Sequence, residues 1–128
     1  MAVSPSSEGF LVHPTLVRTL IAIVEPYADR LRVVPSESMA YYTETKRPAA
    51  NGRPMMFAAG RDGKTGTSYH FFPLYLWPEL ADDLDPLLRK RMTGKTCFTF
   101  KAVDTELFSG LHTLTELGFE RYEAAGYL

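Results

Sequence analysis

The sequence lacks the cysteines, the basic excess and the long apolar runs that mark several classes of protein. Cys97 is its only cysteine, so neither an intrachain disulfide nor a cysteine-rich metal site is expected. With 14 Lys and Arg against 15 Asp and Glu, the net charge is −1. Proteins that bind nucleic acid or anionic membranes through charge usually carry a strong basic excess. We therefore expect neither a nucleic acid nor a membrane as a partner.

The sequence also shows no sign of export or membrane insertion. No apolar run approaches the roughly 20 residues that a transmembrane helix needs. The first ten residues, MAVSPSSEGF, have neither the basic region nor the apolar region of a secretory signal. We expect a cytoplasmic protein.

What is present suits one globular domain. The chain has 128 residues, of which 45% are hydrophobic and 23% are charged, close to the average for soluble proteins. Residues 1–12 are rich in Ser, Pro and Gly in their first part and predict a loose lead-in. Residues 13–128 predict a single domain with enough apolar side chains for its own core.

Helical periodicity appears at the two ends of that domain. From Pro14, which suits a first helical turn, apolar residues recur on one broad face as far as Tyr27. Asp104 is a fitting N-cap for a final helix that runs to about Tyr122. Gly118 lies within the apolar stripe of that helix, which predicts a close approach of helix and sheet.

Five strands are expected between the two helices, in short runs rich in apolar, aromatic and β-branched residues. These runs are residues 31–34, 39–45, 54–59, 68–72 and 96–101. Pro78 and Pro86 each suit the start of a short helix, and the second of these helices is expected to end near Gly94. The order predicts an α+β fold: a mostly antiparallel sheet of about five strands, with the N- and C-terminal helices on one face and a short helical insert before the last strand.

Four residues of the final helix resemble a metal-binding group by their spacing. They are His112, Glu116, Glu120 and Glu123. Carboxylate and imidazole groups bind iron and other divalent ions with little geometric demand. The same residues fall on the face opposite the apolar stripe, so a solvated polar face is the favoured interpretation and a metal contact is the alternative.

A second candidate site centres on His70, in the middle of an expected strand. Strand alternation places His70 on the face opposite Tyr69. If that face carries no helix, His70 can join Tyr42 and Glu44 in a shallow polar and aromatic ligand site. A hydrogen-bonded structural histidine is the alternative. Cys97 is interpreted as a buried small apolar residue, and no cysteine–histidine arrangement is expected.

Three stretches of the sequence resemble a known family. MMFAAGRDG, SYHFFPLY and GKTCFTF, followed by a closing helix, are similar to the YdhG-like family of small bacterial domains. The resemblance covers roughly residues 54–122, and its motifs are structural. It implies an aromatic hairpin, a helix, a strand that begins at the Gly-Lys-Thr triplet, and a C-terminal helix. Some members of the family are described as frataxin-like iron chaperones, and most have no assigned activity.

Three hypotheses for the function follow. The first is a small, non-catalytic cytoplasmic domain that binds an unknown small molecule or protein, with a homodimer through an exposed strand edge left open. The second is an intracellular iron chaperone that uses the surface carboxylates of the final helix. The third is an enzyme with a site at His70 and Tyr42.

Overall fold

A computed structural model describes residues 11–128 of the chain. The expected lead-in, residues 1–12, therefore falls almost wholly outside the described residues. The elements are α2 (Pro14–Val24), η1 (Glu25–Arg30), β1 (Leu31–Val33), β2 (Tyr41–Pro48), β3 (Pro54–Asp62), β4 (Thr67–Phe71), α3 (Pro73–Leu76), η2 (Pro78–Ala81), α4 (Pro86–Arg89), β5 (Cys97–Phe100) and α5 (Thr105–Ala124).

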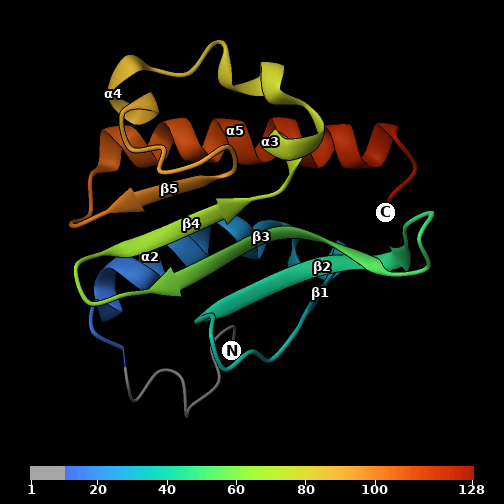
Figure 1. Cartoon of the computed structure of the whole chain (residues 1–128), viewed down its shortest axis with the longest axis horizontal. Helices are drawn as coiled ribbons and strands as arrows, with labels where there is room; N and C mark the ends of the chain where they lie inside the picture. The colour runs from blue at the N-terminus through green and yellow to red at the C-terminus, as the bar shows by residue number, and fades with distance from the viewer. Residues whose placement is uncertain (1–10) are drawn as a thin grey trace.

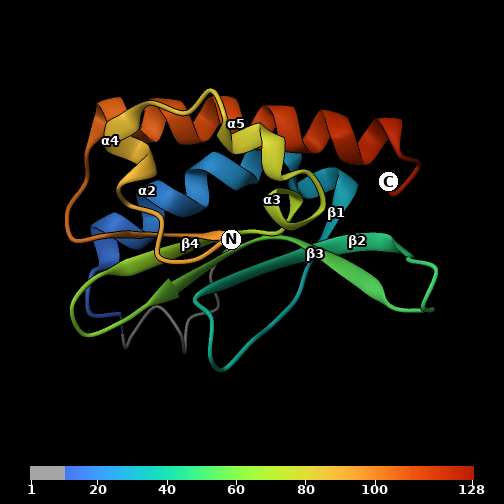
Figure 2. The ribbon, with the colours of Figure 1, turned by 45° about the horizontal axis from the view of Figure 1, so that its top comes forward.

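The five strands form one sheet in the order β1-β2-β3-β4-β5, and every neighbouring pair is antiparallel. Helices α2 and α5 lie side by side on one face of this sheet, with the insert α3–η2–α4 beside α5 (Figure 1). Within residues 11–128, no helix lies on the opposite face (Figure 2). The predicted α+β fold, with both long helices on one face, is confirmed.

The closing helix begins and packs as its sequence predicts. The carboxylate of Asp104 accepts a hydrogen bond from the backbone N–H of Leu107 at 3.1 Å, which caps α5. A Cβ atom at Gly118 would lie 2.8 Å from Cε2 of Phe71 and 3.0 Å from Cβ of Pro73. Since no real Cβ packs that closely against a buried ring, only glycine lets α5 approach the sheet here.

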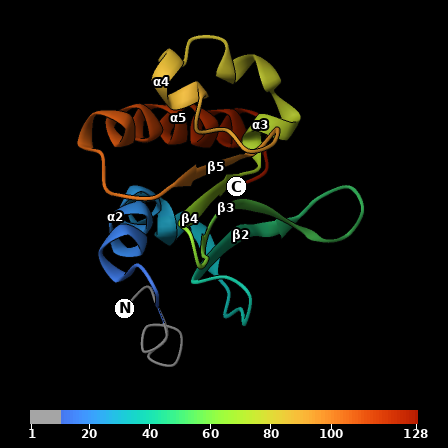
Figure 3. The same ribbon diagram turned by 60° about the vertical axis from the view of Figure 1, so that its left-hand side comes forward.

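The β2–β3 hairpin is longer than the sequence indicates. We predicted that the first strand of the hairpin ends at Thr45 and that the second begins at Pro54. Instead, β2 continues to Pro48, which pairs with Pro54. The hydroxyl of Thr45 donates to the backbone carbonyl of Arg47 at 2.7 Å and accepts from the N–H of Met55 at 3.0 Å. These side-chain bonds support an irregular part of the ladder, and the hairpin projects away from the helices (Figure 3).

The second short helix of the insert, by contrast, is shorter than expected. Helix α4 has only four residues and ends at Arg89, with Lys90 as its C-cap. Gly94 is therefore not the residue that ends it, and the prediction of a helix reaching that far is wrong. The predicted start is confirmed, because the carboxylate of Asp85 accepts from the N–H of Leu87 at 2.8 Å.

A bulge in β3 decides which side chains share a face in the middle of the sheet. The register shifts between Tyr42 and Glu44. The hydroxyl of Thr43 fills the gap: it donates to the carbonyl of Ala58 at 2.6 Å and accepts from the N–H of Ala58 at 3.1 Å. Phe57 and Ala58 both join the core as a result, and Tyr42 remains opposite Ala59.

Candidate functional site

The face of the sheet that lies opposite α2 and α5 carries the candidate ligand site. Tyr69 marks the helix side, because its hydroxyl is hydrogen-bonded to that of Thr115 in α5 at 2.7 Å. Neighbouring residues of a strand point to opposite faces, so His70 lies on the other side. We call this other side the open face. It carries Tyr42, Glu44, Ala59, Arg61, Ser68, His70, Cys97 and Thr99.

The strand register places four of these residues in one row across the sheet. Tyr42 pairs with Ala59, Ala59 pairs with His70, and His70 pairs with Cys97. Tyr42 and His70 therefore share a face, with only the methyl group of Ala59 between their strands. Glu44 lies on the same face, further along β2, where it pairs with Met56.

The row brings together a cysteine and a histidine that sequence reasoning kept apart. Sγ of Cys97 lies 3.1 Å from Nδ1 of His70. Cys97 is half-buried rather than fully buried, and it is not simply a small apolar residue of the core. The expectation that no cysteine–histidine arrangement exists is wrong. The signal that finds the pair is the β4–β5 register, which two isolated strand predictions do not supply.

The environment of His70 keeps its imidazole neutral. Burial lowers the pKa of His70 below its usual value, and the positive charge of Arg61 lowers it further. A neutral imidazole carries one N–H. If the Cys97 thiol donates its hydrogen to Nδ1, the N–H lies at Nε2. This Nε2 atom is buried and has no hydrogen-bond partner among residues 11–128.

An unpaired buried polar nitrogen is costly and therefore informative. Leaving such a group without a partner costs about 1–3 kcal/mol. Most buried polar atoms in folded proteins avoid that cost, and the exceptions call for an explanation such as a water, an ion or a ligand. Nε2 of His70 is one of two such side-chain atoms among the described residues; the other is the hydroxyl of Tyr41 on the helix side.

Tyr42 occupies the other end of the row, and Glu44 lies further along the same strand on the same face. The guanidinium of Arg32, in the neighbouring strand β1, lies 3.7 Å from the carboxylate of Glu44. Burial raises the pKa of Tyr42, and the negative charge of Glu44 raises it further. Tyr42 is therefore a neutral phenol at physiological pH. The open face thus offers an aromatic ring, a balanced ion pair and an unsatisfied imidazole across the four neighbouring strands β1 to β4.

The structure does not gather the candidate metal ligands of α5. His112, Glu116, Glu120 and Glu123 are all exposed. Glu123 pairs with Arg30 at 3.2 Å, and Glu120 faces a shallow hollow beside Arg121. Across residues 11–128, no three His, Cys, Asp or Glu side chains are arranged so that they could hold a metal ion.

The chain was compared with protein-family models, curated proteins and solved structures, and none matches. The resemblance to the YdhG-like family stays a prediction. None of the helices in residues 11–128 combines the length and the apolar character that crossing a bilayer demands. The function is therefore argued from the geometry of the open face.

Proposed function

We propose that the protein is a small non-catalytic binding domain that receives a small molecule on the open face of its sheet. The ligand contacts are His70, Tyr42 and Glu44, as the sequence predicts, together with Cys97. The observation that carries the proposal is the buried Nε2 atom of His70, which has no hydrogen-bond partner. A ligand oxygen that accepts from this N–H removes a penalty that the free protein bears.

The chemistry of the row indicates what the ligand presents. Nε2–H needs an acceptor oxygen, and the positive charge of Arg61 acts on the same imidazole. An oxygen with negative character, as in a carboxylate or an amide carbonyl, meets both conditions. The ring of Tyr42 and the methyl group of Ala59 lie beside it in the row and favour a flat apolar portion. We infer a planar carbonyl or carboxylate compound.

Titration with benzamide, benzoate or toluene tests the binding proposal. The readout is the ring ¹⁵N NMR signals of the histidines. We expect benzamide or benzoate to shift the Nε2 signal of His70, because their oxygens accept its hydrogen, and toluene to leave it unchanged. His70→Leu should weaken binding of both oxygen-bearing probes. Toluene binding as tightly as benzamide would contradict the proposal, since the imidazole would then contribute nothing.

A second candidate function is a nucleophilic site, which the contact between Sγ of Cys97 and Nδ1 of His70 favours. A neutral imidazole can accept the thiol proton while the sulfur attacks an electrophile. It ranks second because such pairs usually have a third group that orients the imidazole, and Nε2 has no partner. The rate of iodoacetamide alkylation at Cys97 separates the two. Nucleophilic activation predicts a faster rate in the wild type than in His70→Leu. Equal rates would rule out activation and leave ligand binding as the proposed function.

One edge of the sheet is better suited than the other to pairing with a second copy of the chain. The β5 edge of the sheet is occupied by residues 91–93, through Met92 and two backbone bonds of 2.9 Å. The outer strand β1 is the remaining edge, with Val33 exposed. If the protein forms a homodimer by strand pairing, β1 is the edge that we expect it to use. The iron-chaperone alternative depends on the family resemblance and on the carboxylates of α5, which form no metal-binding group within residues 11–128.

A further inference from the structure

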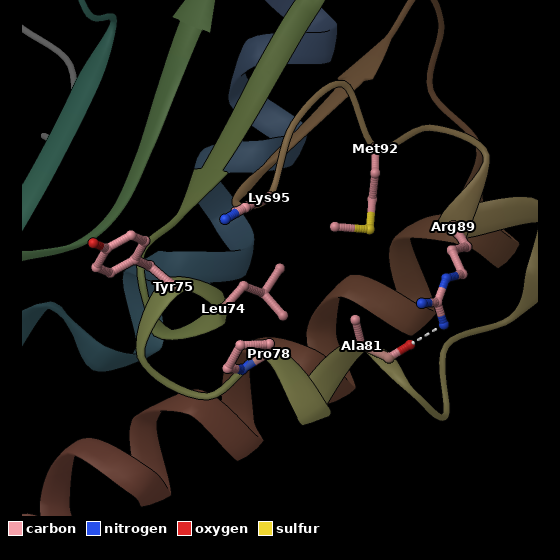
Figure 4. A pocket seen from close by; sticks show the side chains of 7 residues that line it. All are labelled: Leu74, Tyr75, Pro78, Ala81, Arg89, Met92 and Lys95. Atoms are coloured by element: carbon pink, nitrogen blue, oxygen red, sulfur yellow. Dashed lines mark hydrogen bonds between the residues drawn. The ribbon is translucent and has the colours of Figure 1, made fainter.

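A pocket separate from the open face lies between the helical insert and the loop that leads into β5 (Figure 4). It has a volume of about 330 Å³, and none of its lining residues belongs to the row of the open face. Four apolar side chains form most of its wall: Leu74, Pro78, Ala81 and Met92. A volume of this size lies at the lower end of the range for small-molecule sites.

The pocket exists because prolines divide the insert. Pro73, Pro78 and Pro86 each begin a separate helical piece, and a proline inside one long helix would break it. The chain therefore curves around a hollow instead of filling it. Leu88, which is fully buried, packs near Gly110 of α5 and holds the insert in place. The hollow is thus part of a packed structure, not a gap beside a loose loop.

Two cations flank the apolar wall, and no acidic residue lines it. Figure 4 shows Arg89 and Lys95 on opposite sides, with Leu74 and Met92 between them. Nη1 of Arg89 donates to the carbonyl of Ala81 at 2.9 Å, which orients the guanidinium. Lys95 makes no hydrogen bond or ion pair with any other described residue. A free ammonium group at the mouth of an apolar pocket is a site for an anion that has an apolar body.

We propose that this pocket binds an amphipathic carboxylate of medium chain length. The aliphatic part fills the space between Leu74, Pro78 and Met92, and the carboxylate pairs with Lys95. The exposed ring of Tyr75, which stacks on Phe72 at 5.3 Å between centroids, forms the outer wall. A phosphate-rich nucleotide fits less well, because the wall is mainly apolar and the volume is small.

Octanoate and octan-1-ol are the matched probes, because they differ in charge and share the chain. Titration of each into the full-length protein, followed by the methyl NMR signal of Met92, measures both affinities. We expect octanoate to bind about twofold to fivefold more tightly than octan-1-ol, as one partly exposed ion pair would give. Met92→Trp fills the pocket and should abolish binding of both probes.

The charge is tested by Lys95→Gln, with Lys101→Gln as the control lysine outside the pocket. Arg89 is left unchanged, because its bond to Ala81 also supports the insert. Lys95→Gln should weaken octanoate to the affinity of octan-1-ol and leave octan-1-ol unaffected, while Lys101→Gln should change neither. Equal affinity of the two probes in the wild type overturns the proposal, and so does octanoate binding that survives Met92→Trp.

The same titration distinguishes octanoate binding in this pocket from octanoate binding on the open face. His70→Leu should leave octanoate binding unchanged, because His70 does not line this pocket. If octanoate instead shifts the signals of His70 and not of Met92, the carboxylate belongs to the open face, and the inference about this pocket is wrong. The pocket can thus fail while the binding proposal for the open face stands, and the reverse is equally possible.

Discussion

The two faces of the sheet differ in how fully their buried polar side chains are hydrogen-bonded. On the face covered by helices, the Tyr69 hydroxyl is hydrogen-bonded to Thr115 at 2.7 Å and the Tyr122 hydroxyl to the carbonyl of Met56 at 2.7 Å. Tyr41 is the exception: its hydroxyl is unpaired, and burial raises its pKa to about 12, with Glu25 adding to the effect. On the open face, the imidazole in the middle of the row keeps one nitrogen unpaired.

The difference suits stability on the covered face and, as we propose, recognition on the open face. The covered face is filled by rings in edge-on contact, such as Phe57 against Phe71 and Phe57 against Tyr122, with centroids 5.3 Å apart in each pair. Such packing leaves no room for change. On the open face, Tyr42, Ala59, His70 and Cys97 lie in register, and the unpaired imidazole nitrogen of His70 is the contact that we propose for a ligand. We expect substitutions on the covered face to lower the stability of the fold. Replacing the unpaired imidazole on the open face should leave the stability unchanged or raise it.

The largest effect should come from Gly118→Ala in α5. The added methyl would meet the fully buried ring of Phe71, which cannot move aside. Overpacking of this kind costs about 3 kcal/mol at the upper end of its usual range, against a helix-propensity gain of at most about 1 kcal/mol. Urea unfolding measures the net loss.

Gly110→Ala in the same helix is the matched control. Only the terminal methyl Cδ2 of Leu88, at 2.9 Å, would have to shift there. We expect a clearly smaller loss, or a gain from helix propensity. Equal unfolding midpoints for the two variants would show that the covered face is less tightly packed than the contacts indicate.

A smaller loss should follow Tyr69→Phe, which leaves the fully buried Thr115 hydroxyl without its partner. The expected cost is about 1–2 kcal/mol, since an unsatisfied buried hydroxyl bears its whole desolvation penalty. Adding Thr115→Val removes the orphaned group and should recover part of the loss. Thermal unfolding of the two single variants and the double variant tests this, and purely additive losses would argue against the bond.

Below about pH 4, acid should act through Asp62, which joins the end of β3 to the start of α2. Burial alone would raise the pKa of Asp62, but hydrogen bonds from the His13 side chain, from the N–H groups of Val12 and His13 and from Thr67 lower it overall. A carboxyl with a lowered folded pKa stabilises the protein above its unfolded pKa of about 3.9 and loses that contribution as pH falls through the folded value.

The measurement is unfolding free energy against pH, for the wild type and for Asp62→Asn. The wild type should lose stability below about pH 4, where unfolded aspartate takes up protons. Asp62→Asn should be less stable at neutral pH and show a flatter acid limb. An acid limb of unchanged steepness in the variant would mean that other carboxylates cause the loss.

On the open face, His70→Leu should leave stability at pH 7 unchanged or raise it by up to about 1 kcal/mol, because it removes an unpaired buried group. Its folded pKa lies below the unfolded value of about 6.5, so acid costs the wild type stability from about pH 6.5 downward. That upper part of the acid loss should disappear in the variant. A destabilisation as large as that of Tyr69→Phe would erase the contrast between the two faces.

The smallest effect concerns iron. Glu116 and Glu120 are exposed and belong to no cluster that could hold a metal among residues 11–128. Calorimetric titration with ferrous ion should therefore give the same weak or absent heat for the wild type and for the double variant Glu116→Ala/Glu120→Ala. A saturable signal that the double variant loses would restore the iron-chaperone hypothesis.

Local patterns predicted the elements well where side chains decide them. The apolar stripes defined α2 and α5, and Asp104 and Asp85 capped the helices they were expected to cap. The strand ends were less accurate, because Thr45 and the cross-strand ladder extend β2 through Lys46 to Pro48, residues with no strand pattern of their own. A ladder depends on the partner strand, which a local pattern does not contain.

By itself, the sequence determined the α+β order, the face on which His70 lies and the need for a glycine at position 118, since each depends on periodicity or on a single side chain. Only the tertiary structure decided that Cys97 meets His70, that Nε2 stays unpaired, and that the candidate metal ligands of α5 remain apart. The physical reason is that these relations arise from strand register and from what packs beside α5. Both are set by packing between segments that lie far apart in the chain.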